Sequence, residues 1–259
     1  MQPLVRRVEQ GGALSCAGIC GSAQPFVAAL LRRALPQRPI VVVSDFLRTQ
    51  ESCQQDLETW LGTSPLFYPA WEVLPHESKL PHADVIAERL QTLVALAPKS
   101  NRSASTDPKL IVTSVAALLQ KTFPAAQLPQ RTRTLARGDR ANPLDLVEWL
   151  EEQGYEPEAQ VTQKGDLAMR GGIVDVFPPT SPWPVRLEFF GDELESLREF
   201  DPLTQISREE TTMVVLPPAG ELGLLKSQTQ GDRGDALATL LDYLPRETIF
   251  LLCEPEQLT

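Results

Sequence analysis

The stretch PIVVVSD at positions 39–45 limits the possible folds of this chain more than any other segment. Four apolar β-branched residues follow one another with no polar residue between them, and the run ends in Ser44 and Asp45. A strand with one face in water would alternate apolar and polar side chains, so this run is typical of a strand buried on both faces in a parallel sheet. Helix-like and strand-like segments alternate around it, and we therefore expect an open α/β sheet.

This alternation extends over residues 1–120, which we assign to a first, α/β domain. Residues 51–61 and 82–97 have helical patterns, and the second of these segments is apolar along one helical face. Residues 64–69 are predicted to form a short strand, and residues 109–120 a strand that runs into a helix. The order is that of a sheet whose strands are connected by helices.

The composition changes at residues 121–140, which are rich in Pro and Arg and have no sustained apolar period, so we place a domain boundary there. A well-marked helix follows. Asn142 can cap its first turn, Pro143 suits the first helical position, and Gly154 suits a left-handed stop. Several strand-like segments and few helices come next, and residues 121–218 are therefore predicted to form a smaller α+β domain inserted into the first.

Residues 219–259 are predicted to return to the first domain. They contain a polar Gly-rich loop at 228–235, a helix at 236–244 and a strand at 248–254, which is again an α/β order. The sequence stops at Thr259, soon after the last strand. We therefore expect the chain to be a piece of a longer protein.

Charge and composition exclude several classes of function. The formal net charge is −10, whereas a general nucleic-acid-binding surface needs clustered Lys and Arg. No apolar run approaches the ~20 residues that cross a bilayer, and the four cysteines form no CxxC pair, which favours a cytoplasmic protein with reduced thiols and no membrane contact. His76 and His82 are expected to be ordinary loop residues, with His82 at the start of a helix, so no metal and no other cofactor is predicted.

The segment GICGSAQPFVAAL, which starts at Gly18, has the outline of a phosphate-binding loop without its chemistry. Such a loop needs glycines for close backbone approach, a Lys for the β- and γ-phosphates and a hydroxyl for Mg²⁺. Gly18 and Gly21 keep the turn, but Ala23, Gln24 and Pro25 occupy the positions of the last Gly, the Lys and the hydroxyl residue. Pro25 also removes a backbone N–H from the first helical turn. We expect a structural turn that binds no nucleotide.

The strand-like segment VRLEFF, which begins at Val185, has an unusual solvent face. Alternation places its first, third and fifth residues on the core side, and Arg186, Glu188 and Phe190 on the other side, ahead of a Gly-Asp pair that suits a tight turn. Two interpretations are open. In the first, Phe190 packs under the turn and Arg186 pairs with Glu188 or a nearby acid. In the second, the three side chains form part of an interface, where Arg and aromatic residues are enriched. The same choice applies to Arg170 in MRGG.

Three segments carry a resemblance to a known family. RGGIVDVFPP and VRLEFFGDELESLREFDPLTQ resemble the domain that the excision-repair helicase UvrB shares with the bacterial transcription-repair coupling factor. FYPAWEVLPHESKLPHADVIAERLQTL is similar to the coupling factor's own version of the first domain. The resemblance implies a degenerate P-loop, helicase-like parallel-sheet domain with an inserted α+β domain, the UvrB-homology module of the coupling factor.

The resemblance also implies a partner and its contact residues. In this family the inserted domain binds UvrA, the damage-recognition ATPase of nucleotide excision repair. Arg170, Arg186 and Phe190 fall on the positions that contact UvrA, and Glu188 matches a contacting acid in UvrB. We expect each Arg to offer a bidentate fork to a carboxylate of UvrA, and Phe190 to fill an apolar pocket.

The implied function is a non-catalytic docking module that recruits UvrA to stalled RNA polymerase. No catalytic residue is expected in these residues, and in the whole protein RNA polymerase and DNA would be bound by other domains of an ATP-driven translocase. The alternative is a UvrB-type DNA-dependent ATPase, which needs the missing Lys, the hydroxyl and a damage-probing hairpin. A third possibility is an α/β protein with a degenerate nucleotide fold and no role in repair.

Overall fold

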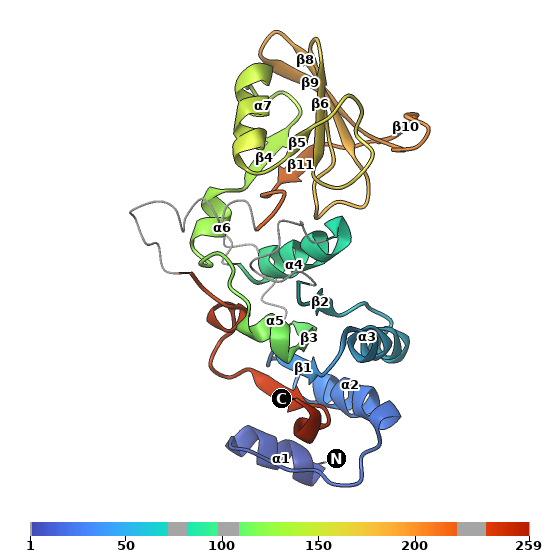
Figure 1. Cartoon of the computed structure of the whole chain (residues 1–259), viewed down its shortest axis with the longest axis vertical. Helices are drawn as coiled ribbons and strands as arrows, with labels where there is room; N and C mark the ends of the chain where they lie inside the picture. The colour runs from blue at the N-terminus through green and yellow to red at the C-terminus, as the bar shows by residue number, and fades with distance from the viewer. Residues whose placement is uncertain (1, 72–81, 98–108, 222–236, 259) are drawn as a thin grey trace. The chain divides into compact units, whose positions relative to one another are not determined.

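The computed structural model describes residues 2–71, 82–97, 109–221 and 237–258 of the chain (Figure 1). By their internal contacts these residues belong to two compact units. The first unit comprises Met1–Ala70, Asn101–Lys121 and Thr239–Thr259. The second comprises Trp71–Ser100 and Thr122–Ala238. The fold is mixed α/β, with one parallel sheet and two further sheets.

A four-stranded parallel sheet in the order β12-β1-β3-β2 forms the centre of the first unit. Its strands are β1 Ile40–Ser44, β2 Leu66–Tyr68, β3 Leu110–Ser114 and β12 Ile249–Leu252. Every residue of β1 and of β3 is buried, which confirms the prediction of a central strand covered on both faces. The strand predicted near the end of the chain is also present, and it pairs with β1.

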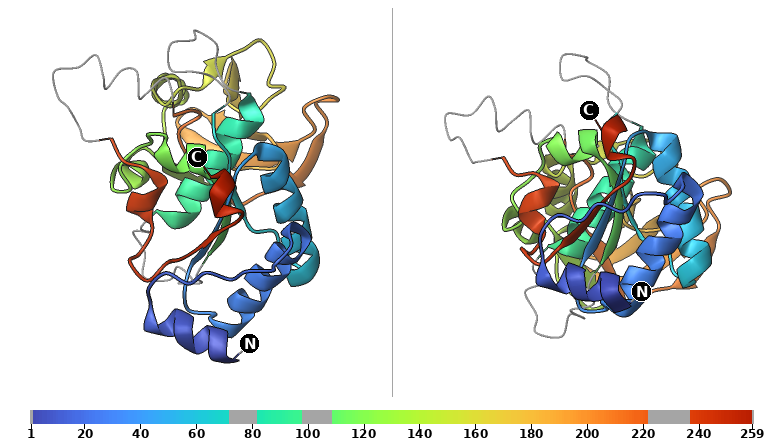
Figure 2. Two further views of the ribbon diagram at one scale, coloured as in Figure 1. Left: turned by 60° about the horizontal axis from the view of Figure 1, so that its bottom comes forward. Right: turned by 90° about the horizontal axis from the view of Figure 1, so that it is seen from below.

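Helices lie on both sides of this sheet. They are α1 Gln2–Gln10, α2 Gln24–Ala34, α3 Leu47–Leu61 and α5 Val115–Leu119, with the 3₁₀ helices η1 Gly21–Ala23, η2 Leu240–Tyr243 and η3 Pro255–Gln257. In the right-hand view of Figure 2, α2 and α3 (blue) lie on one side of the strands and α5 (green) and η2 (red) on the other. Leu31, Leu57 and Val42 belong to the apolar core between the blue helices and the sheet.

The second unit contains a six-stranded sheet in the order β10-β9-β8-β7-β6-β5 and a two-stranded sheet of β4 and β11. All pairs are antiparallel except β5 with β6. The strands are β4 Arg133–Ala136, β5 Glu156–Pro157, β6 Asp166–Arg170, β7 Ile173–Val176, β8 Val185–Phe190, β9 Glu193–Phe200, β10 Ser207–Glu210 and β11 Met213–Leu216. The helices are α4 Ala83–Leu96, α6 Gln127–Gln130 and α7 Pro143–Glu152.

Helix α7 begins and ends where the sequence predicts. The side-chain oxygen of Asn142 accepts hydrogen bonds from two backbone N–H groups of the first turn, at 2.9 and 3.4 Å, and Gly154 adopts a φ of +89° just beyond the helix. The apolar side of α7, with Leu146 and Leu150, shares a core with the inward residues of the six-stranded sheet. One face of that sheet is therefore closed by packing, and charged side chains of the strands lie on the other.

A buried ion pair joins three distant segments of the second unit. Arg89 on α4 donates from Nε to Oε2 of Glu221 at 2.7 Å, and Thr122 Oγ1 donates to Oε1 of Glu221 at 2.5 Å. The guanidinium of Arg89 also stacks on the ring of Trp71, with 4.5 Å from Cζ to the ring centroid. Both charged side chains are buried, so the ion pair compensates charges that are removed from water.

The predicted helix over residues 236–244 is wrong, because only the one-turn 3₁₀ helix η2 forms there. Ala238 is extended and makes a backbone bridge to Thr122, so it is not available to a helix. Thr239 and Asp242 then form a capping box around the short turn. The Gly-rich loop predicted before this segment lies outside the described residues.

Candidate partner-binding surface

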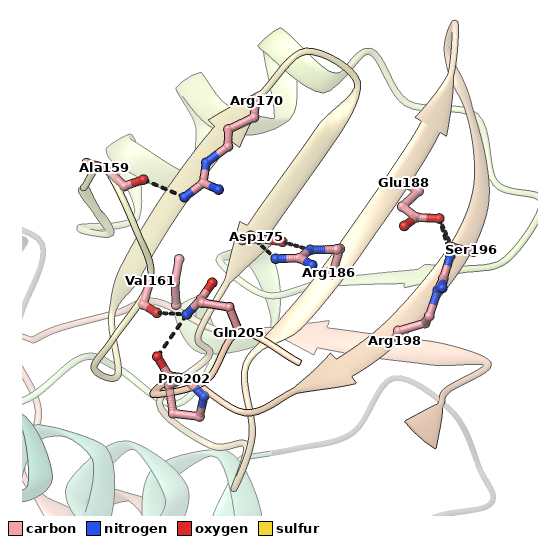
Figure 3. A network of polar contacts seen from close by, with 10 residues as sticks. All are labelled: Ala159, Val161, Arg170, Asp175, Arg186, Glu188, Ser196, Arg198, Pro202 and Gln205. Atoms are coloured by element: carbon pink, nitrogen blue, oxygen red, sulfur yellow. Dashed lines mark hydrogen bonds and ion pairs between the residues drawn. The ribbon is translucent and has the colours of Figure 1, made fainter. Parts of the chain in front are cut away.

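The four contact residues that the resemblance implies come from two strands of the six-stranded sheet. Arg170 ends β6, and the other three lie on β8. Strand pairing aligns Arg170 with Ile173 on β7, and Ile173 with Glu188 on β8, so the sheet brings distant parts of the sequence to one surface (Figure 3). We call the outward side of β6–β9 the polar face; its residues are Arg170, Asp175, Arg186, Glu188, Ser196 and Arg198, with Phe190 at its edge.

The alternation predicted for β8 is confirmed. Val185 and Leu187 are buried and Phe189 packs against the same core, while the remaining three residues of the strand point outward. Phe190 is 76% exposed, so it does not tuck under the following turn. The turn itself starts at Gly191, whose φ of +61° suits a glycine in a two-residue hairpin connection.

Arg186 forms a bidentate ion pair within the sheet. Its Nε and Nη2 donate to the two carboxylate oxygens of Asp175 at 2.7 and 2.8 Å, and its guanidinium lies over the buried ring of Phe200 at 4.8 Å. Hydrogen bonding to Asp175 raises the pKa of Arg186 above its ordinary value. Asp175 thus uses the Nε and Nη2 edge of the guanidinium, so the predicted bidentate contact with a partner carboxylate would have to use the Nη1 side of Arg186.

Glu188 is held by two donors from the neighbouring strand β9. Its Oε2 accepts from Ser196 Oγ and from Arg198 Nη2, both at 2.6 Å. The Ser196 hydrogen bond, followed by the hydrogen bond and charge of Arg198, holds the pKa of Glu188 below its ordinary value. About a third of the Glu188 side chain is exposed, so its carboxylate is ordered and still reaches solvent.

Arg170 is the least constrained charged residue of the polar face. It is exposed, and its Nη2 donates to the backbone carbonyl of Ala159 at 2.8 Å. Among the described residues it forms no ion pair, unlike Arg186. A bidentate contact with a carboxylate remains open to this side chain.

Sequence reasoning missed three members of the polar face: Asp175, Ser196 and Arg198. Each acts on a residue of β8 from a neighbouring strand, and Asp175 is only 4% exposed. Their roles depend on strand register, which the spacing within a single strand does not give. The alternating apolar pattern of VDV and of ELESLREF was the available signal that these residues face the same side.

The second unit matches a known domain family, the UvrB interaction domain, over residues 134–222, which include the whole polar face. The chain is 35% identical over 218 residues to the transcription-repair-coupling factor of Mycobacterium bovis (84% of this chain, 17% of that protein). It is 33% identical over 255 residues to that of Myxococcus xanthus (96% and 21%) and 32% over 183 residues to that of Escherichia coli (71% and 15%). The chain is homologous to a segment of the transcription-repair coupling factors.

The chain spans about a fifth or less of the length of these coupling factors, since they are matched over 17%, 21% and 15% of their own sequences. The family match begins within β4 and ends just after β11. It therefore covers most of the second unit and leaves the parallel sheet of the first unit outside.

In this coupling-factor homologue, the segment with the outline of a phosphate loop leads directly into α2. Gly18 has a φ of +81°, and Gly21 opens the short helix η1. Among the described residues, only a helix and a loop precede it, whereas a phosphate loop follows a strand. Gln24, at the expected Lys position, donates from Nε2 to the carboxylate of Glu254 at 2.7 Å. A carboxylate thus lies close to the start of α2, where an anion would otherwise bind.

The remaining sequence candidates have structural roles. His82 caps α4, its Nδ1 accepting from the backbone N–H of Asp84 at 3.5 Å, as predicted. His76 lies outside the described residues. Within the described ranges, no cluster of three or more His, Cys, Asp or Glu side chains is arranged to hold a metal ion. No described helix has the length and apolarity to span a membrane.

Proposed function

We propose that this chain is a non-catalytic docking module of a transcription-repair coupling factor, and that it recruits the damage-recognition protein UvrA to stalled RNA polymerase in nucleotide excision repair. The observation that supports this proposal most strongly is the polar face. It lies within the match to the UvrB interaction domain and presents the highly exposed Phe190 beside a set of ordered charged side chains. Aromatic and Arg side chains are the most frequent anchors of protein interfaces.

The four proposed contact residues would act in different ways. Arg170 can donate a bidentate pair to a carboxylate of UvrA, and Phe190 can fill an apolar pocket. Arg186 uses its fork on Asp175 and keeps its Nη1 group for the partner. Glu188 uses Oε2 within the sheet and keeps Oε1 as an acceptor.

We further propose that this chain performs no nucleotide chemistry. Residues 1–120 would be a degenerate helicase-like domain, residues 121–218 the docking domain and residues 219–259 the return segment. The contact between Gln24 and Glu254 supports this view, because it places negative charge where a phosphate would bind. RNA polymerase and DNA would be bound by regions outside these residues, in a cytoplasmic protein whose full length is an ATP-driven translocase.

Binding of purified UvrA to the chain, measured by titration calorimetry, tests the docking proposal. Phe190→Ala and Arg170→Ala should each weaken binding, by about 2 kcal/mol for Phe190, because an anchor residue is lost. Leu119→Ala is the matched control, since Leu119 is a comparably exposed apolar residue of the first unit. Thermal unfolding should be unchanged in all three variants.

Equal affinity of wild type and Phe190→Ala would contradict the proposed surface. ATP hydrolysis stimulated by damaged DNA would instead support the UvrB-type ATPase. Absence of any UvrA binding by the folded wild-type chain would favour an α/β protein without a role in repair.

A further inference from the structure

The polar face contains two arginines that lie directly opposite each other on neighbouring strands. The register aligns Asp175 on β7 with Arg186 on β8, and Arg186 with Arg198 on β9. Like charges facing each other across a strand pair repel. Here each guanidinium turns away to a different acid, Arg186 to Asp175 and Arg198 to Glu188 (Figure 3).

The result is two ion pairs side by side, each formed between two side chains of the sheet. The Asp175 and Arg186 side chains are 4% and 19% exposed, and the ring of Phe200 supports the guanidinium from below. Glu188 and Arg198 are each about one-third exposed, and Ser196 adds a second donor to the Glu188 carboxylate. Arg186 and Glu188, two of the four proposed contact residues, therefore each have a partner that fixes their orientation before anything binds.

Fixing a side chain in advance changes the affinity of a surface. Long side chains lose rotamer freedom when a partner binds them, which costs roughly a two- to tenfold factor in affinity for each side chain that must be ordered. Arg186 and Glu188 are already ordered, and both keep a group directed to solvent. Among the described residues, Nη1 of Arg186 and Oε1 of Glu188 have no hydrogen-bond partner.

We propose that Asp175 and Arg198 are positioning residues of the polar face. Asp175 holds Arg186, and Arg198 holds Glu188, in the orientations that UvrA binds. The inference rests on the proposed function. It also defines the partner's chemistry: an acceptor opposite Nη1 of Arg186 and a donor opposite Oε1 of Glu188. Asp175 and Arg198 themselves do not touch the partner.

A double-mutant cycle tests the role of Arg198. UvrA affinity is measured for Arg198→Met, Glu188→Gln and the double variant. Arg198→Met should weaken binding roughly three- to tenfold, because Glu188 is then no longer pre-ordered. In the Glu188→Gln background the same change should have little further effect, and Arg198→Lys should restore part of the affinity. The substitution to Met removes a buried Nε–H that has no partner, so folding should be little affected.

Arg208→Met is the matched control, because Arg208 is a basic residue of the same sheet that stacks on Trp183 and has no contact with Glu188. Its affinity for UvrA should equal that of the wild type. The parallel cycle with Asp175→Asn and Arg186→Met should show the same non-additivity. A steady-state ¹⁵N–¹H NOE at Nε of Arg186 should fall in Asp175→Asn, which reports the loss of order without any partner.

The outcomes separate this inference from the proposed function. Losses that add in the double variants would mean that Arg198 or Asp175 contacts UvrA directly, which would overturn the positioning role. Unchanged affinity in Arg198→Met and Asp175→Asn, with the loss retained in Phe190→Ala, would overturn the inference and leave the docking function standing. Absence of binding by the wild-type chain would overturn both.

Discussion

The parallel sheet of the first unit and the six-stranded sheet of the second use their polar side chains in opposite ways. In the first, the buried side chains of Thr113 on β3 and Gln50 on α3 donate hydrogen bonds to backbone carbonyls of β2 and β3, so these donor groups are used inside the unit. In the second, Arg186 and Glu188 form hydrogen bonds on an outward face and remain partly exposed. Polar side chains at the first sheet thus stabilise the fold from inside, whereas those of the second sheet form a partly exposed surface.

The difference follows from how many faces each sheet buries. Strands covered on both sides leave only their ends for a ligand, and at the start of α2 Gln24 and Glu254 already bond each other. The six-stranded sheet is covered on one side by α7, and its other side carries polar side chains at regular spacing beside a small buried cluster that includes Ala168 and Phe200. This difference supports the proposal that the second sheet binds the partner, and four variants test the contrast between the two sheets.

Glu221→Ala should have the largest effect. It removes the buried carboxylate that pairs with Arg89, and loss of one partner of a buried ion pair costs about 3–5 kcal/mol. The free energy of unfolding, from urea titration followed by tryptophan fluorescence, should fall by that amount, since Trp149 and Trp183 report on the second unit. Glu254→Ala, which breaks the exposed bond to Gln24, is the control and should change stability by about 0.5 kcal/mol or less. Equal losses of unfolding free energy in Glu221→Ala and Glu254→Ala would contradict this prediction.

Gly172→Ala should destabilise the six-stranded sheet. A Cβ at this position would lie 2.7 Å from the backbone oxygen of Phe189, so β7 and β8 must shift, at a cost of about 1–3 kcal/mol. Gly21→Ala in the first unit has open space and no positive φ, and should change stability by at most about 0.5 kcal/mol. Thermal unfolding of both variants checks this pair, and a Gly172→Ala protein as stable as Gly21→Ala would contradict it.

The pKa of Glu188 should report the state of the polar face. The folded protein holds this pKa below the ordinary 4.5, so the ion pair stabilises the fold above pH 4.5 and this stabilisation is lost as the pH falls through the lowered folded-state pKa. Ser196→Ala should raise the pKa most, because its hydrogen bond is the largest cause of the shift, and Arg198→Met should raise it less. Carboxyl ¹³C NMR titration measures both, and an unchanged pKa in Ser196→Ala would show that the hydrogen bond is absent in solution.

Gln24→Lys should have the smallest effect. It restores the Lys of a phosphate loop but places the ammonium beside Glu254, where an exposed pair contributes about 0.2–1 kcal/mol. The melting temperature should rise slightly, and calorimetry with ATP and Mg²⁺ should detect no binding, because the Lys is held by the carboxylate and Pro25 removes an N–H. Saturable ATP binding by this variant would mean that the first unit keeps a working nucleotide site.

Local physics made much of the fold predictable. The unbroken apolar run at Ile40 required a strand buried on both faces, and Asn142, Pro143 and Gly154 marked both ends of a helix by their own backbone preferences. The predicted division at residues 120 and 218 stays a prediction. By contacts, residues 71–100 group with the second unit.

The pairing on the polar face was not predictable, because it depends on contacts between strands. Arg186 and Glu188 are two residues apart on β8, so they point to the same side of the sheet. Residues directly opposite on neighbouring strands are closer, with about 4.5–5.5 Å between Cβ atoms. Each therefore pairs across the sheet, Arg186 with Asp175 and Glu188 with Arg198. The prediction of a helix over residues 236–244 is wrong for the same reason: the backbone bridge between Ala238 and Thr122 is a contact between distant segments that the local sequence pattern does not reveal.

The antiparallel pairing of β4 with β11 determines where the segment that carries the polar face begins and ends. Arg133 faces Leu216, so the segment that contains α7 and the six-stranded sheet starts and ends at the same place. A segment with adjacent ends can be cut out of one protein and inserted into an exposed loop of another without stretching its host. The polar face, the β8–β9 hairpin and the supporting helix α7 therefore lie within one segment whose two ends are adjacent, so they can be transferred together to another protein.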